Sequence, residues 1–160
     1  MKKGLVLALT FVASGSLAAP HVDHGVSGEW AIRVNPDNGN GCYMQKVFES
    51  GTVVLVGVAP DANGAYFSAY NPEWTHIVEG DTGSVLLDFG DARFQGEVVG
   101  DTHEGSLGGY AFFDNPEFVT EFAKRQSVII TGSKGSTEEI DLSGSSKAIA
   151  AVRACQAEQT

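Results

Sequence analysis

The residues that could bind a metal ion are concentrated in the short string His21-Val22-Asp23-His24. Neutral imidazoles and a carboxylate at this spacing are ligand types that zinc and copper accept. His21, Asp23 and His24 are therefore weak metal candidates. No further ligand residues stand nearby in the sequence, so a polar tail is the favoured interpretation, and we expect neither a resident metal nor another cofactor.

The other two histidines do not belong to a catalytic pattern. His76 follows a Pro-Glu-Trp turn, and His103 lies in the acidic segment Asp101-Thr102-His103-Glu104-Gly105. A Gly-x-Ser-x-Gly nucleophile elbow, a Ser-x-x-Lys pair and a phosphate-binding glycine loop are all missing from the sequence. We therefore expect no catalytic residues and a protein that is not an enzyme.

The only two cysteines are Cys42 and Cys155. Neither belongs to a Cys-x-x-Cys motif, and the chain begins with features of an exported protein, so a disulfide is the expected state. The bond would tie a C-terminal helix to an early strand, and in the chain-entropy model such a long loop contributes roughly 4–5 kcal/mol.

Aromatic residues gather in two places, the first around Tyr66, Phe67, Tyr70 and Trp74 and the second around Tyr110, Phe112 and Phe113. Alternation along a strand sends about half of such residues inward. If Tyr66, Tyr70 and Trp74 share an exposed face, they form a binding patch, because aromatic side chains dominate interface energetics.

Residues 1–19 have the pattern of a secretory signal peptide: Lys2 and Lys3, a short apolar run, and an end rich in small residues. The apolar run is shorter than the roughly 20 residues that a membrane span needs. Removing this segment takes two of the 10 basic residues and none of the 20 acidic ones, so the formal charge changes from −10 to −12. Such an acidic chain excludes nucleic acid as a partner.

The remaining sequence predicts a mainly β fold of the α+β type. We expect residues 20–27 to be a flexible tail and residues 28–160 to be one domain, an antiparallel β-sandwich or open barrel followed by two short helices. The β-prone runs are 29–34, 42–48, 52–58, 65–70, 85–89, 94–99, 110–113, 127–131 and 138–142. The first helix starts near Asn115 and Pro116, and the second starts near Ser145 with an apolar stripe that includes Cys155.

The C-terminal third resembles a family of exported bacterial proteins. A helix, a hairpin and the entry Leu142-Ser143-Gly144-Ser145-Ser146-Lys147-Ala148 into a last helix follow a β body that opens with Trp30 and an early cysteine. This order is similar to that of proteins related to invasion-associated locus B. The resemblance implies a β-rich periplasmic protein linked to the cell envelope or to host interaction, and it carries over no catalytic residues.

From these observations we expect a periplasmic or secreted protein that binds another protein, is not inserted in a membrane and performs no catalysis. One alternative is an inhibitor of a basic secreted hydrolase such as a lysozyme, in which the acidic segment 101–109 would protrude. Another is a protein that binds a small molecule or a metal, or an uncharacterised enzyme.

Overall fold

The computed structural model describes residues 20–114 and 117–159. The predicted signal peptide and the proposed helix start at Asn115 and Pro116 lie outside these residues. No helix in the described ranges is both long enough and apolar enough to cross a membrane.

One antiparallel sheet of ten strands makes up the body of the protein, in the order β1-β2-β3-β4-β5-β8-β7-β6-β9-β10. The first five strands are β1 (Val22–Ser27), β2 (Trp30–Asn35), β3 (Gly41–Val47), β4 (Val53–Ala59) and β5 (Gly64–Tyr70). The other five are β6 (Thr82–Asp88), β7 (Arg93–His103), β8 (Ser106–Phe113), β9 (Ser127–Gly132) and β10 (Thr137–Asp141). Two short 3-10 turns, η1 (Pro36–Asn38) and η2 (Pro60–Ala62), follow β2 and β4. The predicted mainly β class with antiparallel strands is confirmed, and the arrangement is a single open sheet.

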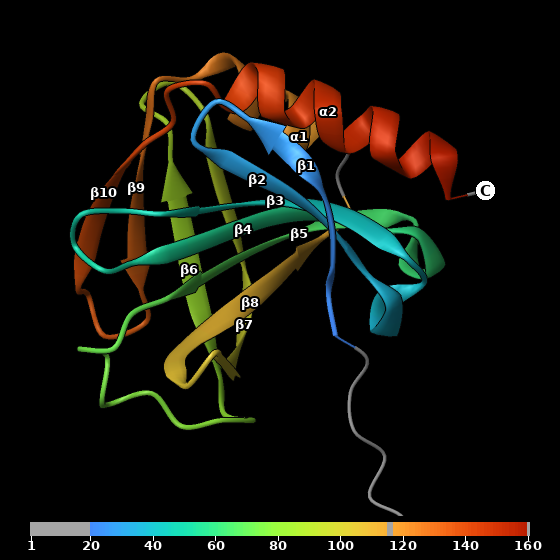
Figure 1. Cartoon of the computed structure of the whole chain (residues 1–160). Coiled ribbons are helices and arrows are strands. Elements are labelled where there is room, and N and C mark those ends of the chain that lie inside the picture. The colour runs from blue at the N-terminus through green and yellow to red at the C-terminus, as the bar shows by residue number, and fades with distance from the viewer. Residues whose placement is uncertain (1–19, 115–116, 160) are drawn as a thin grey trace, which may run out of the picture.

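The sheet curls until its two halves face each other. In Figure 1, β2 to β5 cross the upright strands β6, β9 and β10 at a steep angle, and both helices lie together at the upper end. Side chains from the inner faces of both halves fill the space between them, as in an orthogonal sheet packing. This packing produces one continuous buried cluster around Trp30, Phe67 and Phe122.

A polar network joins the two halves of the curled sheet. The Thr52 hydroxyl, before β4, donates to the Glu138 carboxylate on β10 and accepts a 2.8 Å hydrogen bond from the Asn71 side-chain amide. The Ser50 hydroxyl also donates to Glu138. Thr52 and Asn71 are buried, and the Asn71 side-chain oxygen also accepts a hydrogen bond from the Glu73 backbone N–H at 2.8 Å, so their polar groups have partners, as burial requires.

The N-terminal segment differs from our expectation. Residues 20–27 were predicted to be a flexible tail, but β1 pairs with β2 from Val22↔Val34 to Ser27↔Trp30, with a bulge between Asp23 and Gly25. The two-residue connection Gly28-Glu29 begins with Gly28 at a φ of +63°, which suits the tight hairpin turns that place glycine first. Pairing satisfies the edge of β2, and this tertiary gain outweighs the polar composition of β1.

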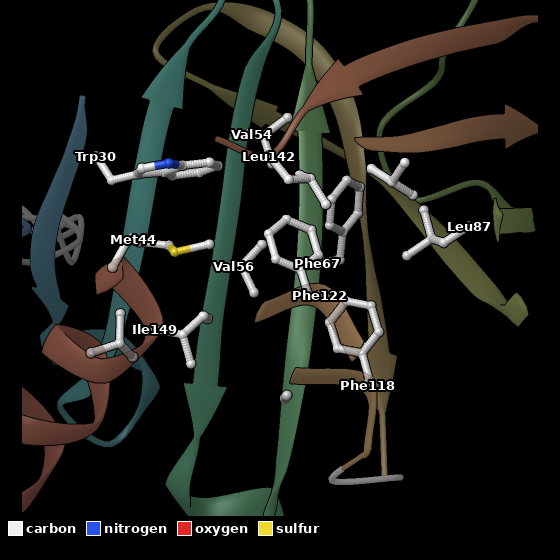
Figure 2. Packing of buried hydrophobic residues seen from close by; sticks show 14 of the residues in the cluster. Trp30, Met44, Val54, Val56, Phe67, Leu87, Phe118, Phe122, Leu142 and Ile149 are labelled. Atoms are coloured by element: carbon white, nitrogen blue, oxygen red, sulfur yellow. The ribbon is translucent and has the colours of Figure 1, made fainter. Parts of the chain in front are cut away.

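The two C-terminal helices close the upper end of the fold, where two helices were predicted. Helix α1 (Glu117–Lys124) inserts Phe118 and Phe122, both fully buried, between the two halves of the sheet. Phe118 stacks on Phe113 with ring centroids 4.2 Å apart, and Phe122 contacts Trp30 edge to face at 6.5 Å. Figure 2 shows Phe118 and Phe122 beside Phe67 in this cluster.

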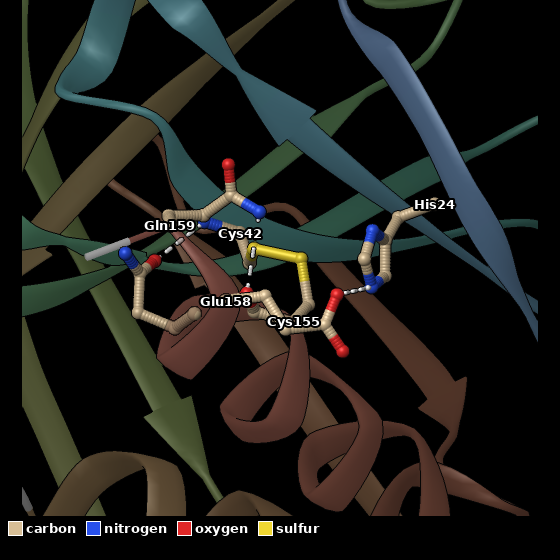
Figure 3. Close-up of a disulfide and its surroundings, with 6 residues drawn as sticks. His24, Cys42, Cys155, Glu158 and Gln159 are labelled. Carbon is tan, nitrogen blue, oxygen red and sulfur yellow. Dashed lines mark hydrogen bonds and ion pairs between the residues drawn. A yellow bond between two sulfur atoms is a disulfide. The ribbon is translucent and has the colours of Figure 1, made fainter.

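Helix α2 (Ser145–Glu158) covers β2 and β3 and is fixed by the disulfide. The predicted bond between Cys42 and Cys155 is confirmed, with the two Cα atoms 6.1 Å apart. Cys42 also donates its backbone N–H to the Gln156 side chain at 2.8 Å. Figure 3 shows His24 of β1 reaching Glu158 near this bond, at 3.4 Å. The last helix is therefore tied to three strands.

Candidate functional site

All four tyrosines of the chain lie on the outer face of the sheet. Their neighbours in β3, β5 and β8 belong to the inner core, so alternation points the tyrosines the other way. Tyr43 and Tyr70 form a second buried cluster with Leu55, and Tyr66 packs against it. We call the surface formed by Tyr43, Tyr66, Tyr70 and Tyr110 the tyrosine face.

A glycine makes room for this face. Gly57 of β4 pairs with Tyr43 on one side and with Tyr66 on the other. A Cβ atom at Gly57 would lie 2.6 Å from the Cβ of Tyr43 and 2.7 Å from the ring of Tyr66. The Tyr66 ring therefore occupies the space that a side chain at position 57 would need, and an alanine there would displace it.

Two histidines and an aspartate cover the tyrosines. His21 Nδ1 lies 2.5 Å from the Tyr43 hydroxyl, and the Tyr70 hydroxyl donates to Asp101 at 2.9 Å. The His103 ring lies over Tyr70, with centroids 5.1 Å apart, and 6.3 Å from the His21 ring. His21 and His103 are thus brought together by segments far apart in sequence.

His103 and Asp101, which cover Tyr70, lie on the β7–β8 hairpin. Its turn places Glu104 and Gly105 at φ values of +49° and +84°, as in the hairpin turns in which both central residues have positive φ. Segment 101–109, the acidic loop that the inhibitor alternative requires, consists of the end of β7, a two-residue turn and the start of β8, and its Asp101 and His103 contact Tyr70. The acidic charge is therefore held in a fixed place.

Burial controls the protonation of the site. Burial raises the pKa of Tyr66 and Tyr70 far above the ordinary phenol value, and it also raises the pKa of Tyr43, with the hydrogen bond to Arg33 acting in the opposite sense. Burial lowers the pKa of His103, although the Glu104 carboxylate opposes that shift. At neutral pH Tyr43, Tyr66 and Tyr70 are therefore uncharged.

The His103 ring and Arg33 complete the electrostatics of the site. His103 Nε2 is buried and has no hydrogen-bond partner. The guanidinium of Arg33 lies between two carboxylates, 3.0 Å from Asp23 and 3.9 Å from Glu104. The positive charge of Arg33 is therefore already matched by neighbouring acids.

The outer part of the tyrosine face is open to solvent. Tyr110 is 41% exposed, and Phe112, two residues along the same strand, is 40% exposed. Phe112 is paired directly with Tyr66, so the exposed rings lie next to the buried ones. The result is an exposed aromatic surface on a hydrogen-bonded base, an arrangement suited to binding.

The predicted aromatic patch is divided by the structure. Tyr66 and Tyr70 lie together on the tyrosine face, but Tyr70 is only 4% exposed. Trp74 packs against the main core on the other side of the sheet. The chain leaves β5 at Tyr70, so the alternation that aligns Tyr66 with Tyr70 no longer governs Trp74. Sequence reasoning missed Tyr43 as a partner and did not assign Tyr110 and Phe112 to the exposed face, although alternation counted from the buried Cys42 and Phe113 would have placed all three outward.

The three weak metal candidates, His21, Asp23 and His24, each contact a different residue. His21 contacts Tyr43, Asp23 pairs with Arg33 and His24 pairs with Glu158. In the described part of the chain, no three His, Cys, Asp or Glu side chains are grouped as a metal site. These residues are therefore engaged in fixing β1 to the sheet and to α2.

Comparison with solved structures identifies a protein with a similar fold. No family model matches the chain, and a search of curated proteins finds no match. Among solved structures, the crystal structure of invasion associated protein B from Bartonella henselae superposes with a TM-score of 0.55 at 15% sequence identity. The match covers 88% of this chain and 99% of that one. The disulfide is consistent with a location outside the cytoplasm. The chain thus shares the fold of invasion associated protein B, the likeness that the sequence predicted.

Proposed function

We propose that this protein is a periplasmic or secreted binding protein that docks another protein on its tyrosine face and performs no catalysis. The observation that carries the proposal is the exposed pair Tyr110 and Phe112 on a face where Tyr43 and Tyr70 are buried and hydrogen-bonded. Aromatic side chains held on a rigid base bind with little loss of conformational entropy, and such residues are enriched among interface hot spots.

Acidic residues around Tyr110 favour a partner with a basic surface. Val99 of β7 pairs with Tyr110. The acids Glu97, which is exposed, and Asp101 lie two residues before and after Val99 on the same strand. The whole chain carries a formal charge of −10, and removal of the predicted signal peptide makes it more negative. A partner with basic residues around an apolar centre is complementary to this surface, and the charges would also accelerate association.

A cell-envelope protein or a host-surface protein is the favoured partner class. The similar fold supports it, because the protein that shares it is described as invasion associated. A second candidate is a basic secreted hydrolase such as a lysozyme, which this protein would inhibit. The acids Asp101 and Glu104 on the β7–β8 hairpin favour this candidate, since their negative charge would attract a basic enzyme.

Crosslinked capture from periplasm or host extract tests the proposal. The mature protein is compared with the double variant Tyr110→Ser/Phe112→Ser and with the control Ile129→Ser, which removes an apolar side chain of similar exposure, 42%, from β9. We expect one enriched partner that the double variant loses and the control keeps. Equal capture by all three proteins would contradict docking on the tyrosine face.

The inhibitor candidate needs a separate assay. Lysozyme activity is measured with excess protein and with the variant Asp101→Asn/Glu104→Gln. Inhibition that the variant abolishes supports this candidate. Unchanged lysozyme activity in the presence of the protein removes it and leaves the envelope or host partner.

A further inference from the structure

A cavity of about 250 Å³ opens on the inner face of the sheet, at the end away from the helices. Its walls come from β5 to β9 and from the segment 71–81, and they include Phe67, Trp74, Val98 and Ile130. Trp74 and segment 71–81 cover one side. The sheet separates the cavity from the tyrosine face, because Ala111 lines the cavity while Tyr110 and Phe112 point outward.

Small residues on five neighbouring strands line this space. At this end of the sheet the inward positions are occupied by glycine or alanine, namely Ala69 on β5, Gly109 on β8, Gly100 on β7, Gly83 on β6 and Gly132 on β9. Ala69 pairs with Gly109, and Gly109 pairs with Gly100, so a row of small residues crosses the sheet. At the helical end, equivalent inward positions carry Phe, Leu and Trp.

Some of these glycines allow another segment to pack closely, whereas Gly132 leaves empty space beside it. A Cβ atom at Gly100 would collide with the Val78 backbone, and one at Gly83 would lie 2.9 Å from Ser133 Oγ, so these two glycines let other segments approach. Gly132 is different: its Cβ would meet only Ser136 Oγ, at 3.7 Å. Packing would therefore allow a larger residue at position 132, and the side chain would project into the cavity.

The mouth of the cavity is polar and carries one basic and two acidic side chains. Hydroxyl side chains line it at Thr82, Ser133, Ser136 and Thr137. The charged residues at the mouth are Lys134, Asp81 and Glu138, and the Glu138 carboxylate already accepts hydrogen bonds from Ser50 and Thr52. The mouth can thus hydrogen-bond a polar head group but offers no strong charge to an ion.

We propose that this cavity is a binding site for a small neutral amphiphile, with a short alkyl chain or a single aromatic ring inside and a hydroxyl or amide head at the mouth. An apolar cavity of about 150 Å³ is sufficient for benzene, so the present volume accommodates a ring or chain with a few more carbon atoms. Protein interiors are otherwise close-packed, and ligand sites combine apolar walls with a few polar groups at the mouth.

Titration of the full mature protein with 1-hexanol tests this site. Binding is followed by the fluorescence of Trp74, with Trp74→Phe as the spectroscopic blank, and by NMR shifts of residues that line the cavity. We expect saturable binding in a one-to-one ratio, with the largest shifts at Val98, Ala111 and Ile130. Shifts confined to the tyrosine face, or no saturable binding, would overturn the proposal.

Two variants that introduce the same leucine side chain separate the cavity from the rest of the protein. Gly132→Leu fills the cavity and should weaken hexanol binding at least about tenfold, whereas Thr131→Leu places the leucine at the adjacent, outward position of β9 and should leave binding within about twofold. If Gly132→Leu does not fold, Ala69→Leu on β5 makes the same test from the opposite wall. Equal hexanol binding by the filled and control variants would overturn the site.

Charged analogues test the head group. Hexanoate and hexylammonium carry the same chain length with a negative or a positive head, and each should bind more weakly than the alcohol, because a charge gains little at this mouth for the water it loses. Tighter binding of either ion than of hexanol would overturn the assignment of a neutral ligand.

Discussion

The inner and outer faces of the sheet both bury aromatic side chains, but the chemistry of the two faces differs. The inner face packs Phe67, Phe113 and Trp30 against the phenylalanines of α1, and contacts there are edge to face, tilted or stacked. The outer face uses tyrosines whose hydroxyl groups reach His21 and Asp101. The inner face therefore contributes stability through apolar burial, whereas the outer face keeps polar groups near a surface that remains partly open.

The largest expected effect comes from breaking the inner face at Phe122. Phe122 is fully buried and contacts Trp30, Phe67 and Phe118. Phe122→Ala should lower the free energy of unfolding by about 3–5 kcal/mol, because it removes apolar burial and leaves a cavity. Chemical denaturation measures the change, and Phe112→Ala on the exposed outer face is the control, for which a loss of similar size would contradict the distinction between the faces.

The disulfide should rank next. The double variant Cys42→Ala/Cys155→Ala opens a loop with a sequence separation of 113 residues and should cost about 2–5 kcal/mol. Because the bond fixes α2 over β2 and β3, amide hydrogen exchange should increase first in α2. Faster exchange in β6 and β7 with α2 still protected would show that the bond stabilises the fold through a different region.

The inner face was also the part that the sequence predicted best. Runs such as Trp30-Ala31-Ile32-Arg33-Val34 alternate strictly and end at turn residues, so both the strand and its buried side can be assigned from local pattern. The two C-terminal helices and the inward direction of Cys155 followed from the same kind of pattern. These features depend on neighbours close in sequence, which a single sequence displays.

The outer face was less predictable because its contacts join distant segments. The string Val22-Asp23-His24 has the composition of a tail, and only the pairing of β1 with β2 makes it a strand. The turn Glu104-Gly105 lacks the usual Asn or Asp, so the hairpin that carries His103 has no strong signal in the sequence. The tyrosine face then forms from β3, β5, β8 and the segment before β1, whose order in the sheet the sequence does not reveal.

A smaller effect is expected from the outer face at Tyr43. Its hydroxyl contacts His21 and is buried with the rest of the side chain. Tyr43→Phe should reduce the free energy of unfolding by about 1 kcal/mol, the typical net contribution of one hydrogen bond. Tyr110→Phe is the matched control, since Tyr110 is 41% exposed, and its stability should equal that of the unchanged protein. A larger loss in the control would show that the exposed hydroxyl is structural.

The smallest expected effect is a pH dependence that belongs to His103 alone. Burial lowers the pKa of His103 in the folded protein, so the unfolded chain binds this proton more readily once the pH falls below the ordinary imidazole value of about 6.5. The stability associated with neutral His103 is therefore fully present above that pH and is lost as the pH decreases towards the folded-state pKa.

Between pH 7.5 and pH 5, the denaturation midpoint of His103→Gln should decline less steeply than that of the unchanged protein. His76→Gln, at an exposed position, should decline like the unchanged protein. Carboxylates contribute to the same decline in every variant, so the difference between the two glutamine variants isolates the ring over Tyr70. Identical pH profiles for both variants would mean that the outer face tolerates a charged His103. The His103 ring would then pack less tightly on Tyr70 and His21 than the ring contacts indicate.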